Sequence, residues 1–80
     1  MSENMIRDIL EKRLRIKAEL LIPENDTKPL TGAPFWLDEI ELAYLFFEVQ
    51  NQLGKPIPPE SLENYAFNSI RGIAAVTQEL

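Results

Sequence analysis

The side chains best placed to do chemistry in this sequence are carboxylates at the start of its most strongly apolar helical stretch. Three of them, Asp38, Glu39 and Glu41, fall within four consecutive residues. A carboxylate can act as a general acid or base, but it needs partner groups that hold the substrate or relay the proton. Apart from Asp38 and Glu41, no second titratable group lies next to Glu39 in the sequence. Acids in a first helical turn also stabilise the helix by about 0.3–1 kcal/mol, and we favour this interpretation of Glu39 over a catalytic one.

The composition excludes most other catalytic chemistry. The chain has no Cys and no His, which rules out disulfides, thiolate nucleophiles, histidine general bases and the usual zinc sites. Several hydroxyls remain as candidate nucleophiles, and we interpret each as one that caps a helix or forms a hydrogen bond within a loop. These hydroxyl residues are Ser2, Thr27, Thr31, Ser61 and Ser69. Because the domain is also too small for a deep pocket, we expect a protein that is not an enzyme and holds no metal.

The charge distribution argues against nucleic-acid binding. The net charge is −5, and residues 1–20 hold five bases against four acids, whereas the remaining residues hold three bases against nine acids. Most of the surface should therefore repel phosphate backbones. The basic cluster from Lys12 to Lys17 is an alternative nucleic-acid site, but a helix end whose cations complement the dipole explains it better.

Length and hydropathy indicate one soluble domain spanning residues 1–80. A chain of 80 residues buries about 60–65% of its unfolded surface, so its core must be well packed. The first residues, MSENMIRDIL, lack the basic and apolar regions of a signal peptide, and no window approaches a membrane span. We predict a cytoplasmic protein of bacterial type with no membrane partner.

The apolar pattern predicts an all-α fold. A first helix should begin at Ser2 or Asn4 and run to about residue 16. Its expected apolar face contains Met5, Ile6, Ile9, Leu10 and Leu14. Residues 23–36 contain many helix breakers, which predicts a long ordered loop that Leu30 and Phe35 anchor to the core. These breakers are Pro23, Asn25, Asp26, Pro29, Gly32 and Pro34.

The clearest helix should run from Asp38, its N-cap, to Leu53, with Gly54 as a left-handed C-cap. Its core-facing residues are Leu42, Leu45, Phe46, Val49 and Leu53. Residues 55–59 should form a stiff connector whose Ile57 side chain is buried in the core. Residues 60–65 should form one or two helical turns. A last helix, capped by Asn68 or Ser69, should bury Ile70, Ile73, Ala74 and Thr77. Gly72 should weaken this helix by about 1 kcal/mol relative to Ala.

A second apolar line on the 38–53 helix is rotated away from the core-facing residues. Ile40, Tyr44 and Phe47 recur at i, i+4 and i+7. In so small a bundle this line is either additional core or a binding surface for a partner or a second copy. Of the aromatic pair that precedes the helix, we expect Phe35 to pack inward as a hydrophobic staple and Trp36 to remain on the surface.

The order of these features resembles the acyl and peptidyl carrier protein family over nearly the whole chain. The matching positions in the turn and second helix are Leu30–Gly32 and Phe35–Leu45, and those that follow are Leu53, Ile57, Pro58, Phe67, Ile70 and Ile73. The resemblance implies a four-helix bundle with three main helices, a short third helix and a long loop after the first. It also implies that a serine opening the second helix carries 4′-phosphopantetheine.

This sequence departs from the family at the attachment position. The serine position falls on Glu39, between Asp38 and Ile40, and a carboxylate gives no comparable stable product. Trp36 stands where the family commonly has Gly. The family's second helix is usually acidic on its partner-facing side, whereas the corresponding positions here are Tyr44, Phe47, Gln50 and Asn51. We therefore expect the basic partners typical of the family to bind weakly.

Two hypotheses follow from the resemblance. The first is a non-catalytic carrier-like protein without a cofactor, in which Glu39 keeps a negative charge where a phosphoserine would be. It would act by docking to a peptide-modifying or acyl-transfer enzyme as a monomer or weak homodimer. Its expected contact residues are Trp36, Glu39, Ile40, Tyr44 and Phe47. The alternative is a functional, divergent carrier of fatty acid, polyketide or peptide biosynthesis that is loaded with 4′-phosphopantetheine.

Overall fold

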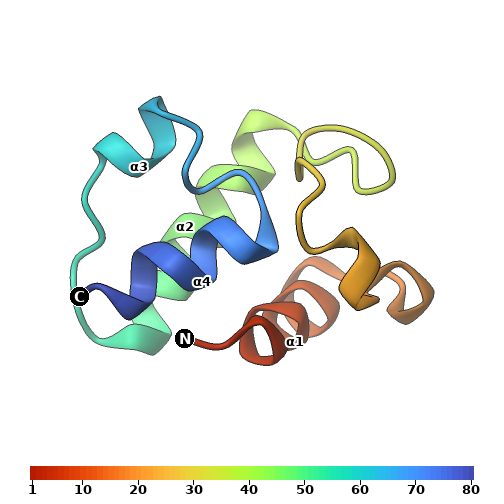
Figure 1. The fold of residues 1–80 in the computed structure, drawn as a ribbon, viewed down its shortest axis with the longest axis horizontal. Coiled ribbons are helices and arrows are strands. Elements are labelled where there is room, and N and C mark those ends of the chain that lie inside the picture. Colours follow the sequence, from red (N-terminus) through yellow and green to blue (C-terminus); the bar gives the residue numbers. More distant parts are fainter.

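The computed structural model describes residues 1–80 as four α-helices without any strand (Figure 1). The helices are α1 (Glu3–Leu14), α2 (Glu39–Leu53), α3 (Glu60–Glu63) and α4 (Ile70–Gln78). The all-α prediction is confirmed, and α3 is the short helix expected after the connector. In Figure 1, α4 crosses in front of α2, and α1 lies below the pair.

Helix α1 begins at the expected serine cap. The hydroxyl of Ser2 accepts a hydrogen bond from the Met5 N–H at 3.3 Å, and the helix ends at Arg15, whose φ of 57° is left-handed. Of the predicted apolar face, Ile6, Ile9 and Leu10 are buried, whereas Met5 is 51% exposed. Met5 lies at the edge of the buried stripe, about 100° around the helix from Ile6, beyond the surface that the other helices cover.

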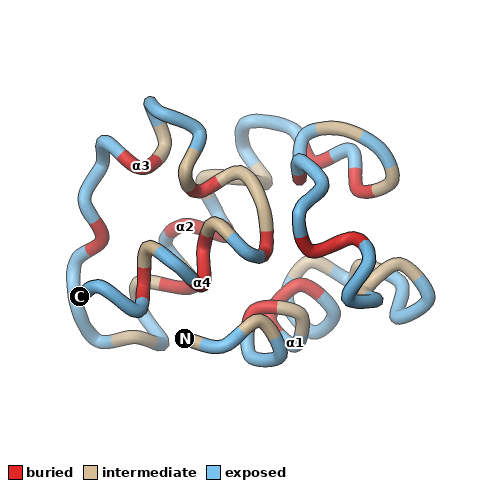
Figure 2. The backbone as a smooth tube through the Cα atoms, in the orientation of Figure 1, coloured by how far each residue is buried: buried red, intermediate tan, exposed pale blue.

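The long segment between α1 and α2 is ordered by two anchors and two short 3-10 helices. The 3-10 helices are η1 (Ala18–Leu20) and η2 (Pro23–Asn25), the second of which lies inside the predicted loop. Leu30 is fully buried and Phe35 is 7% exposed, which confirms both anchors. Figure 2 shows buried positions along this segment. The backbone N–H of Leu30 also donates to the Asn68 carbonyl at 2.9 Å, which ties this segment to the start of α4.

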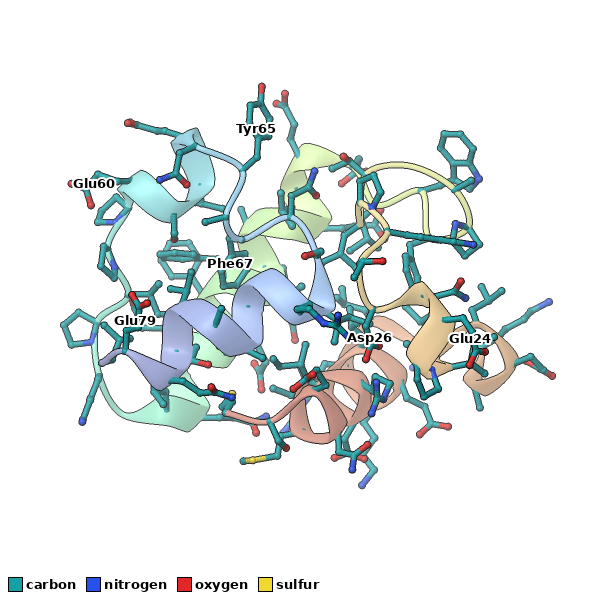
Figure 3. The ribbon with its side chains drawn as sticks, in the orientation of Figure 1. Glu24, Asp26, Glu60, Tyr65, Phe67 and Glu79 are labelled. Atoms are coloured by element: carbon teal, nitrogen blue, oxygen red, sulfur yellow. The ribbon has the colours of Figure 1, made fainter.

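An ion pair that the sequence analysis missed also fixes this segment. The Arg7 guanidinium donates to both carboxylate oxygens of Asp26 at 2.6 and 2.5 Å. Asp26 is buried, and its backbone carbonyl accepts a hydrogen bond from the Arg71 N–H at 2.9 Å (Figure 3). One residue of the loop thereby contacts both α1 and α4.

Helix α4 begins at Ser69, whose hydroxyl accepts from the Gly72 N–H at 2.9 Å. The four residues expected to face inward, Ile70, Ile73, Ala74 and Thr77, are all buried. Gly72 allows a close contact between α4 and the segment before it, which its low helix propensity does not indicate. A Cβ atom at this position would lie 2.1 Å from the Ala66 carbonyl oxygen, so the preceding segment can cross the helix here only because residue 72 is Gly.

Candidate functional site

The carboxylate cluster forms the first turn of α2, and most of it has a structural role. The Asp38 carboxylate accepts from the Glu41 N–H at 2.7 Å, while the Glu41 carboxylate accepts from the Asp38 N–H at 3.1 Å. This reciprocal pair is a capping box, which satisfies two backbone donors at the helix start. Two of the three carboxylates are therefore engaged with backbone, and they form no acid–base pair with Glu39.

Glu39 is the first residue of α2 and is exposed. Its carboxylate makes no hydrogen bond or ion pair within the chain, although it lies at the positive end of the helix dipole, where a negative charge is favourable. The structure therefore presents an unpaired negative charge at the position to which the sequence analysis assigned the missing serine.

The two aromatic residues before α2 differ in burial, as predicted. Phe35 is buried, whereas Trp36 is 70% exposed. Trp36 has a φ of 55°, a left-handed conformation that is costly for a bulky residue, and its N–H donates to the Gly32 carbonyl at 2.9 Å. A hydrophobic staple forms from the residue directly before the N-cap. In this chain that residue is Leu37, which is buried, and not Phe35.

The second apolar line of α2 lies on the surface. Ile40, Tyr44 and Phe47 are 81%, 47% and 63% exposed, and we call these three residues the exposed strip. The core-facing side of α2 is covered as expected, with Leu45, Phe46 and Val49 buried and Leu42 and Leu53 partly buried. Helix α2 is thus apolar on two sides, and the fold covers only one of them.

An apolar groove of about 440 Å³ runs beside the exposed strip, between α2 and the segment that leads into α3. Its walls include Ala43 and Phe47 on α2, and Pro59 and Leu62 on the other side. The side-chain oxygen of Gln50 accepts from the Ile57 N–H at 2.8 Å, which holds the connector against α2. Ile57 is buried, as predicted. This groove is not predictable from the sequence, where the density of Pro residues from 56 to 59 is its only local signal.

A second hollow, of about 520 Å³, lies beside Glu39. Leu37 and Leu42 line one part of it, and Leu62, Tyr65, Phe67 and Asn68 line the other. The side-chain carbonyl oxygen of Asn68 is buried there without a hydrogen-bond donor, while its amide nitrogen donates to the Thr31 hydroxyl at 3.1 Å. The Tyr65 side chain on the same segment is 77% exposed and points away from the body, whereas Phe67 points inward (Figure 3).

The candidate hydroxyl nucleophiles have structural partners, with one exception. Ser2 and Ser69 cap helices, and the Thr31 hydroxyl accepts from Asn68. Ser61 is buried and donates to the Pro58 carbonyl at 2.8 Å. Thr27 is exposed and its hydroxyl makes no hydrogen bond, so its prediction as a hydrogen-bonded loop residue was wrong.

The basic cluster at the end of α1 is partly neutralised. Lys12 pairs with Asp8 at 3.1 Å, and Arg13 pairs with Glu48 on α2 at 3.2 Å. Both cations lie in the last turn of α1, where they complement the helix dipole. No group of three or more acidic residues is arranged to hold a metal ion, and none of the helices combines the length and apolarity needed to cross a membrane.

Comparison of the chain with protein-family models, curated proteins and solved structures gives no match. A functional proposal therefore depends on the geometry of α2 and on the resemblance drawn from the sequence.

Proposed function

We propose that this chain is a non-catalytic docking protein with an acyl-carrier-like scaffold that is not loaded with 4′-phosphopantetheine. The observation that carries the proposal is the surface of α2. An unpaired carboxylate, Glu39, stands at its exposed start, and the uncovered apolar residues Ile40, Tyr44 and Phe47 follow it.

Features of the fold support the carrier-like scaffold. A long ordered segment separates the first helix from the second, a short helix precedes the last one, and Asp38 caps the second helix directly before the position of the missing serine. The left-handed backbone at Trp36 also fits the family's Gly at this position, because Gly adopts a φ of 55° without strain.

The chemistry of Glu39 argues against loading. Attachment of phosphopantetheine requires a hydroxyl oxygen that attacks a pyrophosphate and forms a phosphodiester. A carboxylate would form an acyl phosphate instead, which is labile to water. The other hydroxyls lack the family's local sequence, and Ser61 is buried as well as hydrogen-bonded.

Docking accounts for the apolar residues on the surface. Contiguous exposed apolar side chains on a small protein are typical of interaction sites, and Trp and Tyr often anchor interfaces. The proposed contact surface therefore contains Trp36, Glu39, Ile40, Tyr44 and Phe47. The resemblance suggests a peptide-modifying or acyl-transfer enzyme as the partner.

Incubation with coenzyme A and a broad-specificity phosphopantetheinyl transferase, followed by intact-mass spectrometry, tests the proposal. We expect no mass change for the natural chain and a phosphopantetheine adduct on the Glu39→Ser variant. Thr27→Ala in the Glu39→Ser background should load equally, because Thr27 is not the acceptor. An adduct on the natural chain would overturn the proposal and favour the functional carrier.

A further inference from the structure

The outward face of α2 has a projection at one end and a hollow at the other. Ile40, near the start of the helix, is the most exposed residue of the exposed strip at 81%. A shallow hollow of about 700 Å³ lies along the second half of the helix, where Tyr44 and Phe47 form part of its lining. Gly54 and Lys55 line the far end, and Gly54 has no side chain to fill it. A two-fold axis would bring the projection of one copy to the hollow of another.

Charge is also divided between the two ends of α2. The start of the helix carries three carboxylates, one of which is Glu41, whereas residues 49–59 contain a single charge, that of Lys55. One carboxylate oxygen of Glu41 accepts from the Asp38 N–H, and the other has no partner within the chain. The Lys55 ammonium group donates only to the Leu80 carbonyl, at 3.4 Å, although it has three hydrogens. Both side chains can therefore form an ion pair with another molecule.

We propose that a second copy of this chain covers the outward face of α2, with the two α2 helices packed antiparallel about a two-fold axis at Phe47. Ile40 of each copy would lie over Gly54 of the other, and Phe47 would contact its equivalent. Lys55 of each copy would lie beside Glu41 of the other, which gives two equivalent ion pairs. The inference goes beyond the proposed function, because this dimer covers residues that would contact the partner enzyme, so the dimer and the docked state exclude each other.

The spacing of these residues defines the register. Ile40 precedes Phe47 by seven residues and Gly54 follows it by seven. Both therefore lie about 10 Å from Phe47 along the axis and within about 20° of it around the helix. Glu41 and Lys55 lie about 9 and 12 Å from Phe47 in opposite directions, on the same edge of this face. Because two-fold packing of antiparallel helices brings equal edges together, the ion pairs follow from the same register.

Charge disfavours other arrangements of the two helices. A two-fold axis between Ala43 and Tyr44 would bring Glu41 of one copy beside Glu48 of the other, and parallel packing would bring the acidic helix starts together. In the proposed register the Glu48 side chains lie near the axis, but each is paired with Arg13 of its own chain at 3.2 Å. Each copy carries a net charge of −5, but exposed charges more than about 8 Å apart are largely screened at physiological ionic strength.

The size of the contact predicts a weak dimer. Helix α2 has 15 residues, and two such helices joined along one face bury less than the roughly 1,200 Å² of a stable interface. We therefore expect a dissociation constant of about 10–100 µM. Sedimentation velocity of the natural chain at concentrations from about 5 µM to about 1 mM measures this association.

Substitutions on the outward face test the packing. Phe47→Asp should raise the dissociation constant of the dimer about 10-fold or more, and Lys55→Glu and Glu41→Lys should each raise it about 3-fold or more. The double variant Lys55→Glu, Glu41→Lys should return it to within about 2-fold of the natural value. Positions 41 and 55 are about 20 Å apart within one chain, so this rescue can arise only between copies.

The matched control is Met5→Asp, which alters an exposed apolar residue of α1 and should leave the dissociation constant unchanged. Circular dichroism verifies that each variant is folded. A natural chain that stays monomeric at about 1 mM, or a dimer that a folded Phe47→Asp variant retains, would overturn the inference. Failure of the double variant to recover association would overturn the proposed register.

A membrane is the other occupant that the experiment can detect. Binding of a monomeric natural chain to phosphatidylcholine vesicles, abolished by Phe47→Asp, would assign the exposed strip to a membrane instead of a second copy. The phosphopantetheine-loading experiment reports on the acceptor at position 39 and does not depend on association. The dimer and the proposed function can therefore fail separately.

Discussion

The aromatic rings of Phe46 and Phe47 meet edge to face on adjacent positions of α2, with centroids 5.6 Å apart and planes 87° apart. Phe46 is buried and also contacts the Phe67 ring at 5.2 Å, whereas Phe47 is 63% exposed. The exposed ring is therefore held in place by a core residue. An interface residue that is ordered before binding loses less conformational entropy when a partner arrives.

This arrangement predicts that two neighbouring substitutions destabilise the fold by very different amounts. Phe46→Ala should lower the free energy of unfolding by about 3–5 kcal/mol, because it leaves a cavity between α2 and Phe67. Phe47→Ala should lower it by less than about 1 kcal/mol, since most of this ring already faces solvent. Urea denaturation followed by circular dichroism measures both values. A loss at Phe47 as large as that at Phe46 would show that Phe47 belongs to the core.

The buried ion pair between Arg7 and Asp26 predicts a second stability difference. Asp26→Ala removes the acceptor and leaves the Arg7 guanidinium, whose side chain is only 17% exposed, without its partner. We expect a loss of about 3 kcal/mol or more, because breaking a buried pair leaves an uncompensated charge. Asp8→Ala is the matched control, since it removes an exposed pair with Lys12 and should cost about 0.5 kcal/mol or less. Similar losses in both variants would contradict this assignment.

Gly72 predicts a result opposite to that expected from helix propensity. Replacement of Gly by Ala within a helix usually adds up to about 1 kcal/mol of stability. Here the new Cβ would lie 2.1 Å from the Ala66 carbonyl oxygen and 2.9 Å from the Ser69 hydroxyl, so the backbone of the preceding segment must shift. We expect Gly72→Ala to lower the free energy of unfolding by about 1–3 kcal/mol.

The control for this prediction is Gly32→Ala. Its Cβ would have Pro29 Cγ as its nearest neighbour at 3.6 Å, which is an ordinary contact, so the change should be close to neutral. Thermal unfolding of both variants under the same conditions compares them. A Gly72→Ala variant that is as stable as the natural chain would mean that the segment before α4 moves freely.

The sequence predicted those elements whose signals are local. The start and end of α2 followed from Asp38 and Gly54, because a cap acts on backbone within a few residues. Leu30 and Ile57 could be assigned to the core because each is an isolated apolar residue in a segment rich in helix breakers, and Phe35 because it is a large apolar residue in the same kind of segment. The exposed strip was also recognisable, since its rotation from the core-facing residues follows from helical geometry.

Features that depend on contacts between distant segments were not predictable in this way. Arg7 and Asp26 are 19 residues apart, and nothing in the local sequence of either indicates the other. The requirement for Gly72 depends on where the Ala66 carbonyl passes. The apolar groove likewise exists because the connector folds back along α2, where Gln50 holds Ile57.

Replacement of Trp36 by Gly should raise the stability of the fold but weaken binding to the partner. Its left-handed backbone, with a φ of 55°, costs a residue with a Cβ about 1–2 kcal/mol relative to Gly, and its exposed ring contributes little packing. We therefore expect Trp36→Gly to raise the free energy of unfolding by about 1 kcal/mol, offset partly by the greater flexibility of Gly in the unfolded chain. Tyr65→Gly, at a φ of 64° and 77% exposure, should stabilise by a similar amount.

The two Gly variants should differ in partner binding. If Trp36 anchors the contact surface, Trp36→Gly weakens binding to the native partner about 10-fold or more despite the added stability. Tyr65→Gly leaves binding unchanged, because Tyr65 lies outside the proposed contact surface. Isothermal titration with the purified partner and urea denaturation of each variant supply the two measurements. Equal affinities of the Trp36→Gly variant and the natural chain would remove Trp36 from the contact surface, while the exposed strip would still be tested by Phe47→Asp.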